Sequence, residues 1–236
     1  MRWNVIFIVA LSGYLFGAIP FTKLIRRLFK VSKEAPDIEI PISGTNETYR
    51  VTATGAVTAS MELGTRGGCI VAILDMLKVA LPTLVSRIIF EEPIYFLITA
   101  TAGMIGHIWP VFNRFKGGRG VSSVYGALLV IDWLGAFAVA AGGLLIGIFI
   151  FRDFLLAYVA GLWLLIPWMW LRYNDWSYFY FAIAINIIFI VAMIPDIKQY
   201  LRFKKMGKAD VDTVMEMTPM GRGMRRMMEL LKIRRK

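Results

Sequence analysis

The chain has 236 residues, 58% of them hydrophobic, and a formal net charge of +11 at pH 7. Its mean hydropathy of +0.63 excludes an ordinary soluble domain. The single cysteine, Cys69, excludes an intramolecular disulfide, and no cluster of His, Cys and carboxylate residues has metal-ligand spacing. We therefore expect an integral membrane protein that uses no metal and no cofactor.

Long apolar segments predict the fold. A helix that crosses a bilayer needs about 20 apolar residues. We expect an all-α membrane protein with about seven transmembrane helices, at residues 3–19, 68–90, 94–111, 121–131, 134–151, 154–171 and 177–194. The fourth segment has about 11 residues before Asp132, so we expect it to be tilted, shortened or continuous with residues 117–120.

Basic residues indicate the orientation of these helices. Of the 27 lysines and arginines, 7 lie in residues 20–67 and 12 in residues 195–236. Because basic loops stay in the cytoplasm, we expect the N-terminus outside and the C-terminus inside a multi-pass protein of the plasma membrane. The basic residues after the first segment also favour a retained helix over the alternative, a cleaved signal peptide. The positive face predicts contact with anionic lipid headgroups and argues against nucleic acid.

Two charged residues lie inside the second predicted span. Asp75 and Lys78 are three residues apart and so share one helical face. An unpaired charge at this depth costs about 2.5–3.5 kcal/mol even on the lenient insertion scale. Two interpretations stay open: an ion pair that neutralises itself within the bundle, or a pair that lines a polar cavity open to the cytoplasm. Both place this face toward protein.

A cationic, glycine-rich loop follows the third predicted span. Lys116 and Arg119 supply positive charge, and the glycines among them let backbone N–H groups turn toward an anion. The next helix then begins with two serines, at an end where free N–H groups favour an anion. The candidate phosphate-binding residues are Lys116, Gly117, Gly118, Arg119, Gly120, Ser122 and Ser123. The alternative is a basic loop that only sets topology.

His107 is the only histidine and lies just before this loop, one turn ahead of Pro110. It is either a structural hydrogen-bonding residue or a catalytic one. Its closeness in sequence to Lys116 and Arg119 supports the catalytic interpretation.

The C-terminal segment, residues 201–236, is basic and rich in methionine, and it follows a polytopic domain at residues 1–200 with a cytoplasmic insert at about 31–50. Met224, Met227 and Leu231 fall on one side at helical spacing, with basic residues on the other. This pattern predicts an amphipathic helix on the inner membrane surface. A helix that binds a protein partner is the alternative.

Three segments, residues 13–21, 64–82 and 103–126, resemble the bacterial acyl-phosphate-dependent glycerol-3-phosphate acyltransferases. The resemblance covers residues 12–130 by order and spacing, and the number of spans extends it to about residue 200. It implies a seven-helix fold and a membrane enzyme of phospholipid synthesis. Such an enzyme transfers an acyl chain from acyl phosphate to glycerol 3-phosphate on the cytoplasmic face and yields lysophosphatidate.

The resemblance also implies roles for residues. In the glycine-rich loop it makes Lys116, His107 and Arg119 the catalytic candidates, with Arg119 where the family usually has lysine. The family's first cytoplasmic motif falls on residues 51–58, where Gly55 and Ala56 are retained, and its arginine falls on Met61. The acceptor-loop candidates are therefore Thr54, Gly55, Thr58, Ser60 and Arg66, with Arg50 or Arg66 as a substitute for the missing arginine. The last family motif falls on residues 193–196, where Asp196 is the remaining polar group.

These departures leave two other interpretations. The protein is either a relative that uses a different acceptor or acyl donor, or a non-catalytic lipid-binding or scaffold protein. The catalytic interpretation predicts a polar pocket where Lys116, Arg119 and Asp75 meet the loop at residues 50–60. The scaffold interpretation predicts that this pocket is filled.

Overall fold

The structure is a computed structural model that describes residues 2–30, 38–41, 48–51, 54–151 and 154–205, together with Arg226 and Leu230. Its helices are α1 (Trp3–Gly17), α2 (Phe21–Leu28), α3 (Ala56–Ile89), α4 (Pro93–Ile108), α5 (Val121–Ile131), α6 (Trp133–Leu145), α7 (Phe154–Tyr173) and α8 (Trp176–Lys205). A 3-10 turn η1 (Val111–Asn113) and a π-helical turn η2 (Ile146–Phe151) follow α4 and α6. The strands are β1 (Ile38–Pro41) and β2 (Thr48–Val51).

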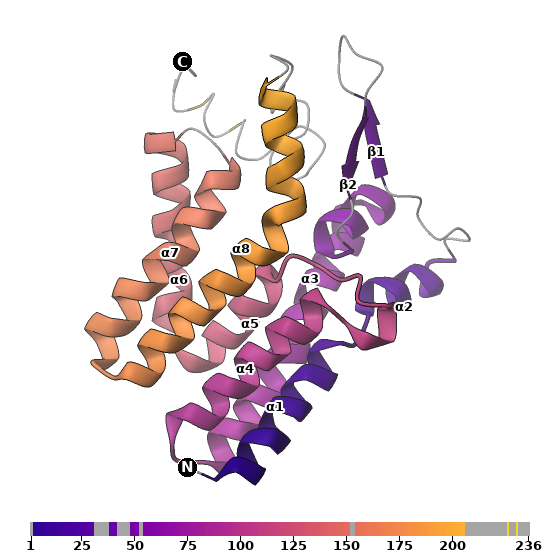
Figure 1. Ribbon diagram of the computed structural model, residues 1–236. Coiled ribbons are helices and arrows are strands. Elements are labelled where there is room, and N and C mark those ends of the chain that lie inside the picture. Colours follow the sequence, from indigo (N-terminus) through magenta and orange to yellow (C-terminus); the bar gives the residue numbers. More distant parts are fainter. Residues whose placement is uncertain are drawn as a thin grey trace.

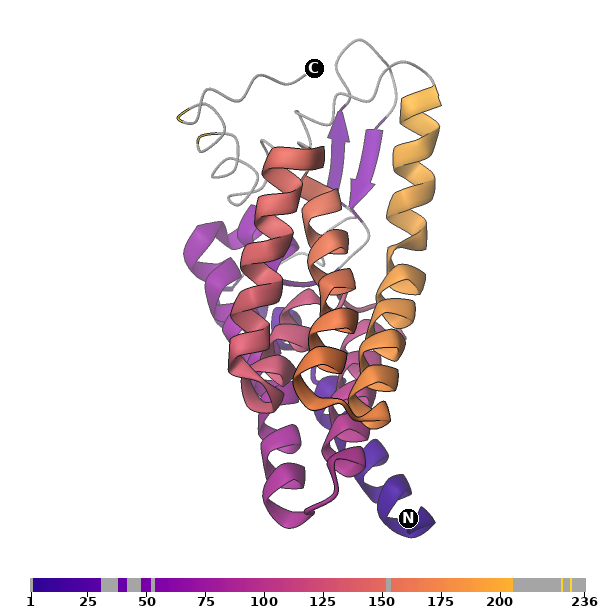
Figure 2. The same cartoon turned by 90° about the vertical axis from the view of Figure 1, so that its left-hand side faces the viewer.

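The helices form an elongated bundle in which α1, α3 and α4 lie on one side and α6, α7 and α8 on the other (Figure 1). The N-terminus lies at one end of the bundle, whereas the strands and the last turns of α8 lie at the opposite end (Figure 2). The strands pair antiparallel, with Ile38 opposite Val51. This hairpin corrects the all-α expectation locally: it lies in the predicted insert, where the sequence analysis assigned no strand.

Apolar helices long enough to cross a membrane confirm an integral membrane protein. Within the described ranges, four such segments occur: Trp3–Leu28, Ala56–Ile89, Pro93–Asn113 and Trp176–Gln199. Two shorter apolar helices, Val121–Ile131 and Trp133–Leu145, correspond to the predicted fourth and fifth spans. The total of seven spans and the orientation of the termini remain predictions. Of the predicted tail, the structure describes residues 201–205, Arg226 and Leu230, so its amphipathic face lies outside the described residues.

Helix α3 is longer than the predicted span, because it begins at Ala56 and not at residue 68. Gly64 interrupts it with φ 73° and ψ 177°, a backbone conformation that side chains other than glycine rarely adopt. Residues 56–63 therefore form a separate helical segment at the end of the membrane-crossing part.

Glycines allow α1 and α4 to touch along their backbones. A Cβ added at Gly13 would overlap the carbonyl oxygen of Thr99, and one added at Gly17 would overlap that of Gly103. From the other side, a Cβ at Gly106 would overlap the carbonyl oxygen of Tyr14. Small residues four apart commonly bring membrane helices this close. The contact fixes the start of α2, which follows α1 directly, relative to the end of α4.

A continuous apolar core joins α4, α5, α7 and α8. Met104, Leu128, Leu165 and Phe189 are among its fully buried side chains. One polar side chain in this region, Asn186 of α8, donates to the carbonyl oxygens of Leu162 at 2.9 Å and Ala182 at 2.8 Å. Its amide group is thus satisfied on the donor side within an apolar environment, as buried polar groups require.

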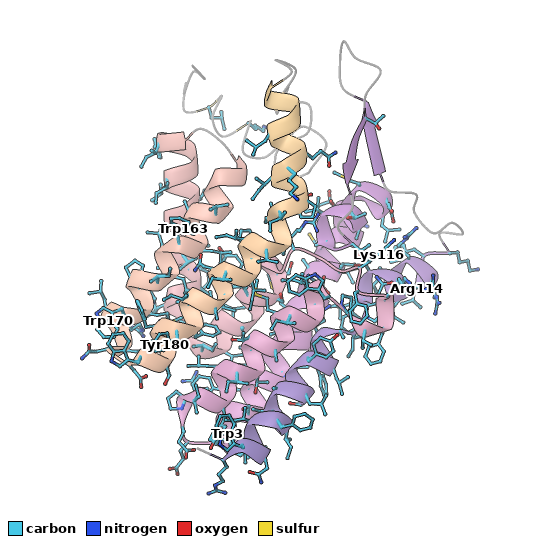
Figure 3. The ribbon with its side chains drawn as sticks, in the orientation of Figure 1. Trp3, Arg114, Lys116, Trp163, Trp170 and Tyr180 are labelled. Carbon is cyan, nitrogen blue, oxygen red and sulfur yellow. The ribbon has the colours of Figure 1, made fainter. Side chains whose placement is uncertain are left out.

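A buried carboxylate orders the junction between α5 and α6. Asp132 is 3% exposed and accepts hydrogen bonds from the backbone N–H of Gly135 at 3.1 Å and from Trp168 Nε1 at 2.8 Å. It also pairs with Arg172 Nε at 2.9 Å. The first bond is an N-cap for α6. The aromatic residues around the α7–α8 turn, including Trp170 and Tyr180, lie far from Lys116 (Figure 3).

Candidate active site

One cavity of about 60 Å³, lined by both apolar and polar residues, lies where α2, α3 and the loop after α4 meet. It is lined by Ile19, Pro20, Phe21, Thr22, Lys23, Arg26, Thr54, Asp75, Lys78, His107, Pro110, Asn113, Lys116 and Gly117. Its volume is sufficient for several water molecules. Lys116, labelled in Figure 3, lines it together with Lys23 and Arg26 of α2.

Three of the residues that line this cavity have buried polar side chains. Lys78 Nζ lies 2.8 Å from Asp75 Oδ1 and donates to the carbonyl oxygen of Ile19 at 3.0 Å. His107 Nδ1 lies 3.6 Å from the same carboxylate oxygen. Asp75, Lys78 and His107 are 2%, 5% and 5% exposed. The Asp75–Lys78 pair is therefore neutralised within the bundle and also lines the cavity, whereas the opening of that cavity to the cytoplasm remains a prediction.

The glycine-rich loop packs directly on the end of α4. The N–H of Gly118 donates to the carbonyl oxygen of His107 at 3.2 Å. A Cβ at Gly118 would overlap His107 Nε2, and one at Gly117 would overlap the carbonyl oxygen of His107. These two glycines thus allow close approach of the loop to the imidazole. Gly120, with φ 90°, turns the chain into α5.

Thr54 joins the first cytoplasmic segment to this loop. Its backbone N–H donates to the carbonyl oxygen of Gly117 at 3.0 Å, and its Oγ1 donates to that of Lys116 at 3.1 Å. Asn113 Nδ2 donates to the same Lys116 oxygen. The backbone of Lys116 is held from two sides while its side chain stays exposed and lines the cavity. This arrangement fixes a cationic residue at the wall of the cavity.

Arg119 has a different environment from Lys116. Its Nη2 lies 2.8 Å from Asp196 Oδ1 on α8, and its Nε pairs with the other oxygen of that carboxylate. The two side chains are 19% and 17% exposed. The guanidinium is thus engaged by a bidentate ion pair, the geometry that arginine favours. Arg119 ties the glycine-rich loop to α8, and the cavity is lined by Lys116 and not by Arg119.

Several other predicted site residues lie away from the cavity lining. Ser123 is buried and its Oγ donates to the carbonyl oxygen of Gly120 at 2.8 Å. Ser60 Oγ donates to the carbonyl oxygen of Val57 at 2.7 Å. Arg66 is exposed on α3. The structure therefore gathers Thr54, Asp75, Lys78, His107, Lys116 and Gly117 at one cavity, and places Gly55, Thr58, Ser60, Arg66, Gly118, Arg119, Gly120, Ser122 and Ser123 outside its lining.

The sequence analysis missed the contribution of α2. Lys23 and Arg26 line the cavity opposite the loop, although their basic run was interpreted only as a topological signal. Arg26 Nε lies 2.9 Å from Glu62 Oε2. The signal that could have identified them is their spacing of three residues on a short helix directly after Pro20.

The charges around the cavity suit an anion. Three cationic side chains, Lys23, Arg26 and Lys116, line it together with the internally paired Asp75 and Lys78. Across residues 2–30, 38–41, 48–51, 54–151 and 154–205, no group of three or more His, Cys, Asp or Glu side chains is placed to hold a metal ion. A phosphate group, with oxygens that accept charge-assisted hydrogen bonds, matches this set of donors.

Comparison with known proteins also points to a phosphate-containing ligand. The sequence profile of a family described as glycerol-3-phosphate acyltransferase matches residues 7–203. A glycerol-3-phosphate acyltransferase of Legionella pneumophila (strain Corby) is 33% identical over 139 residues, which are 59% of this chain and 46% of the relative. A protein of the same name from Yersinia pestis (strain Pestoides F) is 34% identical over 121 residues, 51% of this chain and 50% of the relative. The match thus spans about half the length of these relatives.

Two solved structures share the fold. Both are crystal structures of PlsY, an integral membrane glycerol 3-phosphate acyltransferase, one in its lysophosphatidic acid form and one in its glycerol 3-phosphate form. Their TM-scores are 0.67, their sequence identities 24% and 25%, and each superposition covers 84% of this chain and 92% of the solved chain.

Proposed function

Because the chain belongs to the glycerol-3-phosphate acyltransferase family, we propose that it is a membrane acyltransferase that uses acyl phosphate and glycerol 3-phosphate and yields lysophosphatidate. The observation that carries the proposal is one cavity that is lined by Lys116 of the glycine-rich loop, by the cations of α2 and by the buried Asp75–Lys78 pair. The scaffold interpretation requires this pocket to be filled. The described residues instead enclose a cavity of about 60 Å³.

The chemistry needs few groups. The first hydroxyl of glycerol 3-phosphate attacks the carbonyl carbon of acyl phosphate, the bond from that carbon to the phosphate oxygen breaks, and the hydroxyl proton passes to a phosphate oxygen. Catalysis then rests on holding the two substrates together and on stabilising the departing phosphate. A phosphate that accepts the proton lowers the need for a protein general base. This reaction suits a cavity rich in cations.

Within this proposal, Lys116 and the N–H groups of the loop bind phosphate. His107 supports the loop, since Gly118 packs against its imidazole and the N–H of Gly118 donates to its carbonyl oxygen. Thr54 holds the backbone of Lys116 and orders the acceptor side of the cavity. Arg119 acts as a positioning residue through its pair with Asp196.

We place the cavity on the cytoplasmic face of the plasma membrane, with seven spans, the N-terminus outside and the C-terminus inside. The basic residues of α2 support this orientation, because they lie at the cavity end of the bundle. Anionic headgroups are the partners that this face suits. Residues 1–200 form the proposed membrane domain. The tail at residues 201–236 is proposed to lie on the inner membrane surface, with a protein partner as its alternative.

The test is a direct assay with a matched control. Purified protein in detergent is incubated with palmitoyl phosphate and glycerol 3-phosphate, and lysophosphatidate is measured by mass spectrometry. We expect Lys116→Ala to lower kcat by about 10²- to 10³-fold, as the loss of one electrostatic donor commonly does. Arg114→Ala is the control, because Arg114 is an exposed cation two residues earlier and lies outside the cavity lining.

Full activity of Lys116→Ala would refute the role of the loop. No product from folded, unaltered protein would refute the proposed reaction. In that case a panel of other phosphorylated acceptors and acyl donors separates a changed substrate from a non-catalytic protein.

A further inference from the structure

The turn that precedes Lys116 has an unusual backbone. The N–H of Lys116 donates to the carbonyl oxygen of Asn113 at 3.0 Å, which closes a turn over residues 113–116. Its two central residues, Arg114 and Phe115, have φ 52° and 60°. Glycine, asparagine and aspartate are the residues that commonly adopt two successive positive φ angles in a turn. Larger side chains are strained there, so contacts from the surrounding structure have to hold this turn in place.

Asn113 provides such contacts from within the turn. It is 7% exposed, and its Nδ2 donates to the carbonyl oxygen of Lys116. Asn113 therefore bonds both backbone groups of Lys116, the N–H through its own carbonyl oxygen and the carbonyl oxygen through its side-chain amide. The N–H groups of Asn113 and Phe115 donate to the carbonyl oxygen of Pro110, at 3.0 and 2.9 Å. The turn is thus fixed to the chain that leaves α4.

A second side chain reaches the same oxygen of Lys116 from a different part of the chain. Thr54 Oγ1 donates to it at 3.1 Å. Thr54 lies in the segment before α3, 62 residues away in sequence, so its bond depends on how that segment packs. The bond from Asn113 is formed within the loop itself, between residues three apart. Asn113 is therefore the local determinant of the backbone conformation at Lys116.

This backbone conformation matters because the lysine side chain is long. Lys116 is exposed and lines the cavity, and its ammonium group ends a flexible four-carbon stem. A displaced backbone moves the charge away from the reacting groups, and a displacement of about 1 Å lowers a rate by as much as about 10²-fold. A mobile backbone also increases the conformational entropy that is lost when the charge is held against a substrate. A group that fixes the start of the stem reduces both losses.

We propose that Asn113 is a positioning residue of the site. It holds the backbone of Lys116 against the strain of the turn, and it acts on the reaction only through that lysine. This inference rests on the proposed acyl transfer and adds to it a residue that the sequence analysis did not select, because Asn113 carries no charge.

A double-mutant cycle with Lys116 tests this role. Asn113→Leu keeps a side chain of similar size and removes the donor. We expect it to lower kcat by about 3- to 10-fold, the factor that one hydrogen bond between neutral groups commonly supplies. In the Lys116→Ala background the same change should alter kcat less than about twofold, because the group through which Asn113 acts is absent. An equal loss in both backgrounds would overturn the proposal.

Asn186→Leu is the matched control for a purely structural effect. Asn186 is 5% exposed and also donates its side-chain amide to backbone carbonyl oxygens, but it lies on α8 and outside the cavity lining. This variant should change thermal unfolding and leave kcat within about twofold of the unaltered protein. If both asparagine variants lower kcat alike, the loss reports stability and the positioning role fails.

Relief of strain in the turn gives a second readout. Arg114→Gly and Arg114→Ala remove the same arginine side chain, but glycine adopts a φ of 52° with little strain and alanine does not. In the Asn113→Leu background, we expect Arg114→Gly to return kcat to within about twofold of the unaltered protein and Arg114→Ala to leave it lowered. Equal kcat values for these two double variants would contradict the inference.

Hydrogen exchange keeps this inference separate from the proposed reaction. Deuterium uptake at the amide of Lys116 is followed by mass spectrometry in detergent, on peptides that span residues 113–118. Exchange that is faster by about 3- to 10-fold in Asn113→Leu, and unchanged in Asn186→Leu, supports the inference. If the unaltered protein gives no lysophosphatidate, the proposed function fails, and the exchange rates alone decide whether Asn113 holds Lys116. Equal exchange of Lys116 in Asn113→Leu and in the unaltered protein would refute it.

Discussion

Replacement of Asp75 by asparagine isolates the value of the buried ion pair. The change leaves Lys78, which is 5% exposed, without its carboxylate partner. Removing one member of a buried pair commonly destabilises a protein by about 3–5 kcal/mol, because the remaining charge is not compensated. Lys78 keeps its bond to the carbonyl oxygen of Ile19 at 3.0 Å and lies 5.9 Å from the ring centroid of Phe21. We therefore expect a loss near the lower end, about 3 kcal/mol.

The assay is equilibrium unfolding of the purified protein in detergent micelles. A double-mutant cycle adds Lys78→Met and the variant with both changes. Since the double variant has no orphan charge, its free energy of unfolding should exceed that of Asp75→Asn alone by about 1–3 kcal/mol. A loss below about 1 kcal/mol for Asp75→Asn, or simple additivity in the cycle, would refute the reasoning. Water in the cavity would then hydrate Lys78 well enough without the carboxylate.

Two further variants test contacts that hold the cavity in place. Gly17→Ala should destabilise the fold by about 1–3 kcal/mol, because the methyl group would overlap the carbonyl oxygen of Gly103, and thermal unfolding measures this. Gly142→Ala is the control, since its methyl group would meet only the end of one leucine side chain, and an equal loss would contradict the backbone argument. Arg119→Lys should lower kcat/KM by about tenfold, because one of two charge-assisted bonds to Asp196 is lost. A loss of about 10²-fold or more would instead place the guanidinium on the substrate.

The apolar pattern predicted much of the fold because the bilayer leaves few choices. Blocks near 20 residues must be helices, and the segments Trp3–Leu28 and Trp176–Gln199 contain the first and last predicted spans. The predicted ends of the helices were less accurate than the predicted spans. Helix α3 begins at Ala56 and is kinked at Gly64, where the non-helical backbone of the glycine joins two helical segments. Hydropathy averages do not detect such a kink.

The candidate site was predicted where it depends on local sequence. His107, at the end of α4, is close in sequence to Lys116 in the loop that follows, which indicated that they lie close together, and both line the cavity. Contacts between distant segments were not accessible in the same way. Arg119 and Asp196 are 77 residues apart, and no periodicity relates them. The role of α2 was missed because a basic run has the same composition whether it faces lipid headgroups or a cavity.

The glycine contact between α1 and α4 sets a dimension of the site from within the bilayer. The two walls of the cavity continue these two helices: α2 follows α1, and the loop with Lys116 follows α4. Their separation is therefore determined by a backbone contact that no side chain of the cavity makes. A change of charge on either wall therefore leaves this backbone contact, and with it the distance between the walls, unaltered. The helix contact thus sets the spacing of the cavity walls, and the side chains that line the cavity can change without loss of this spacing.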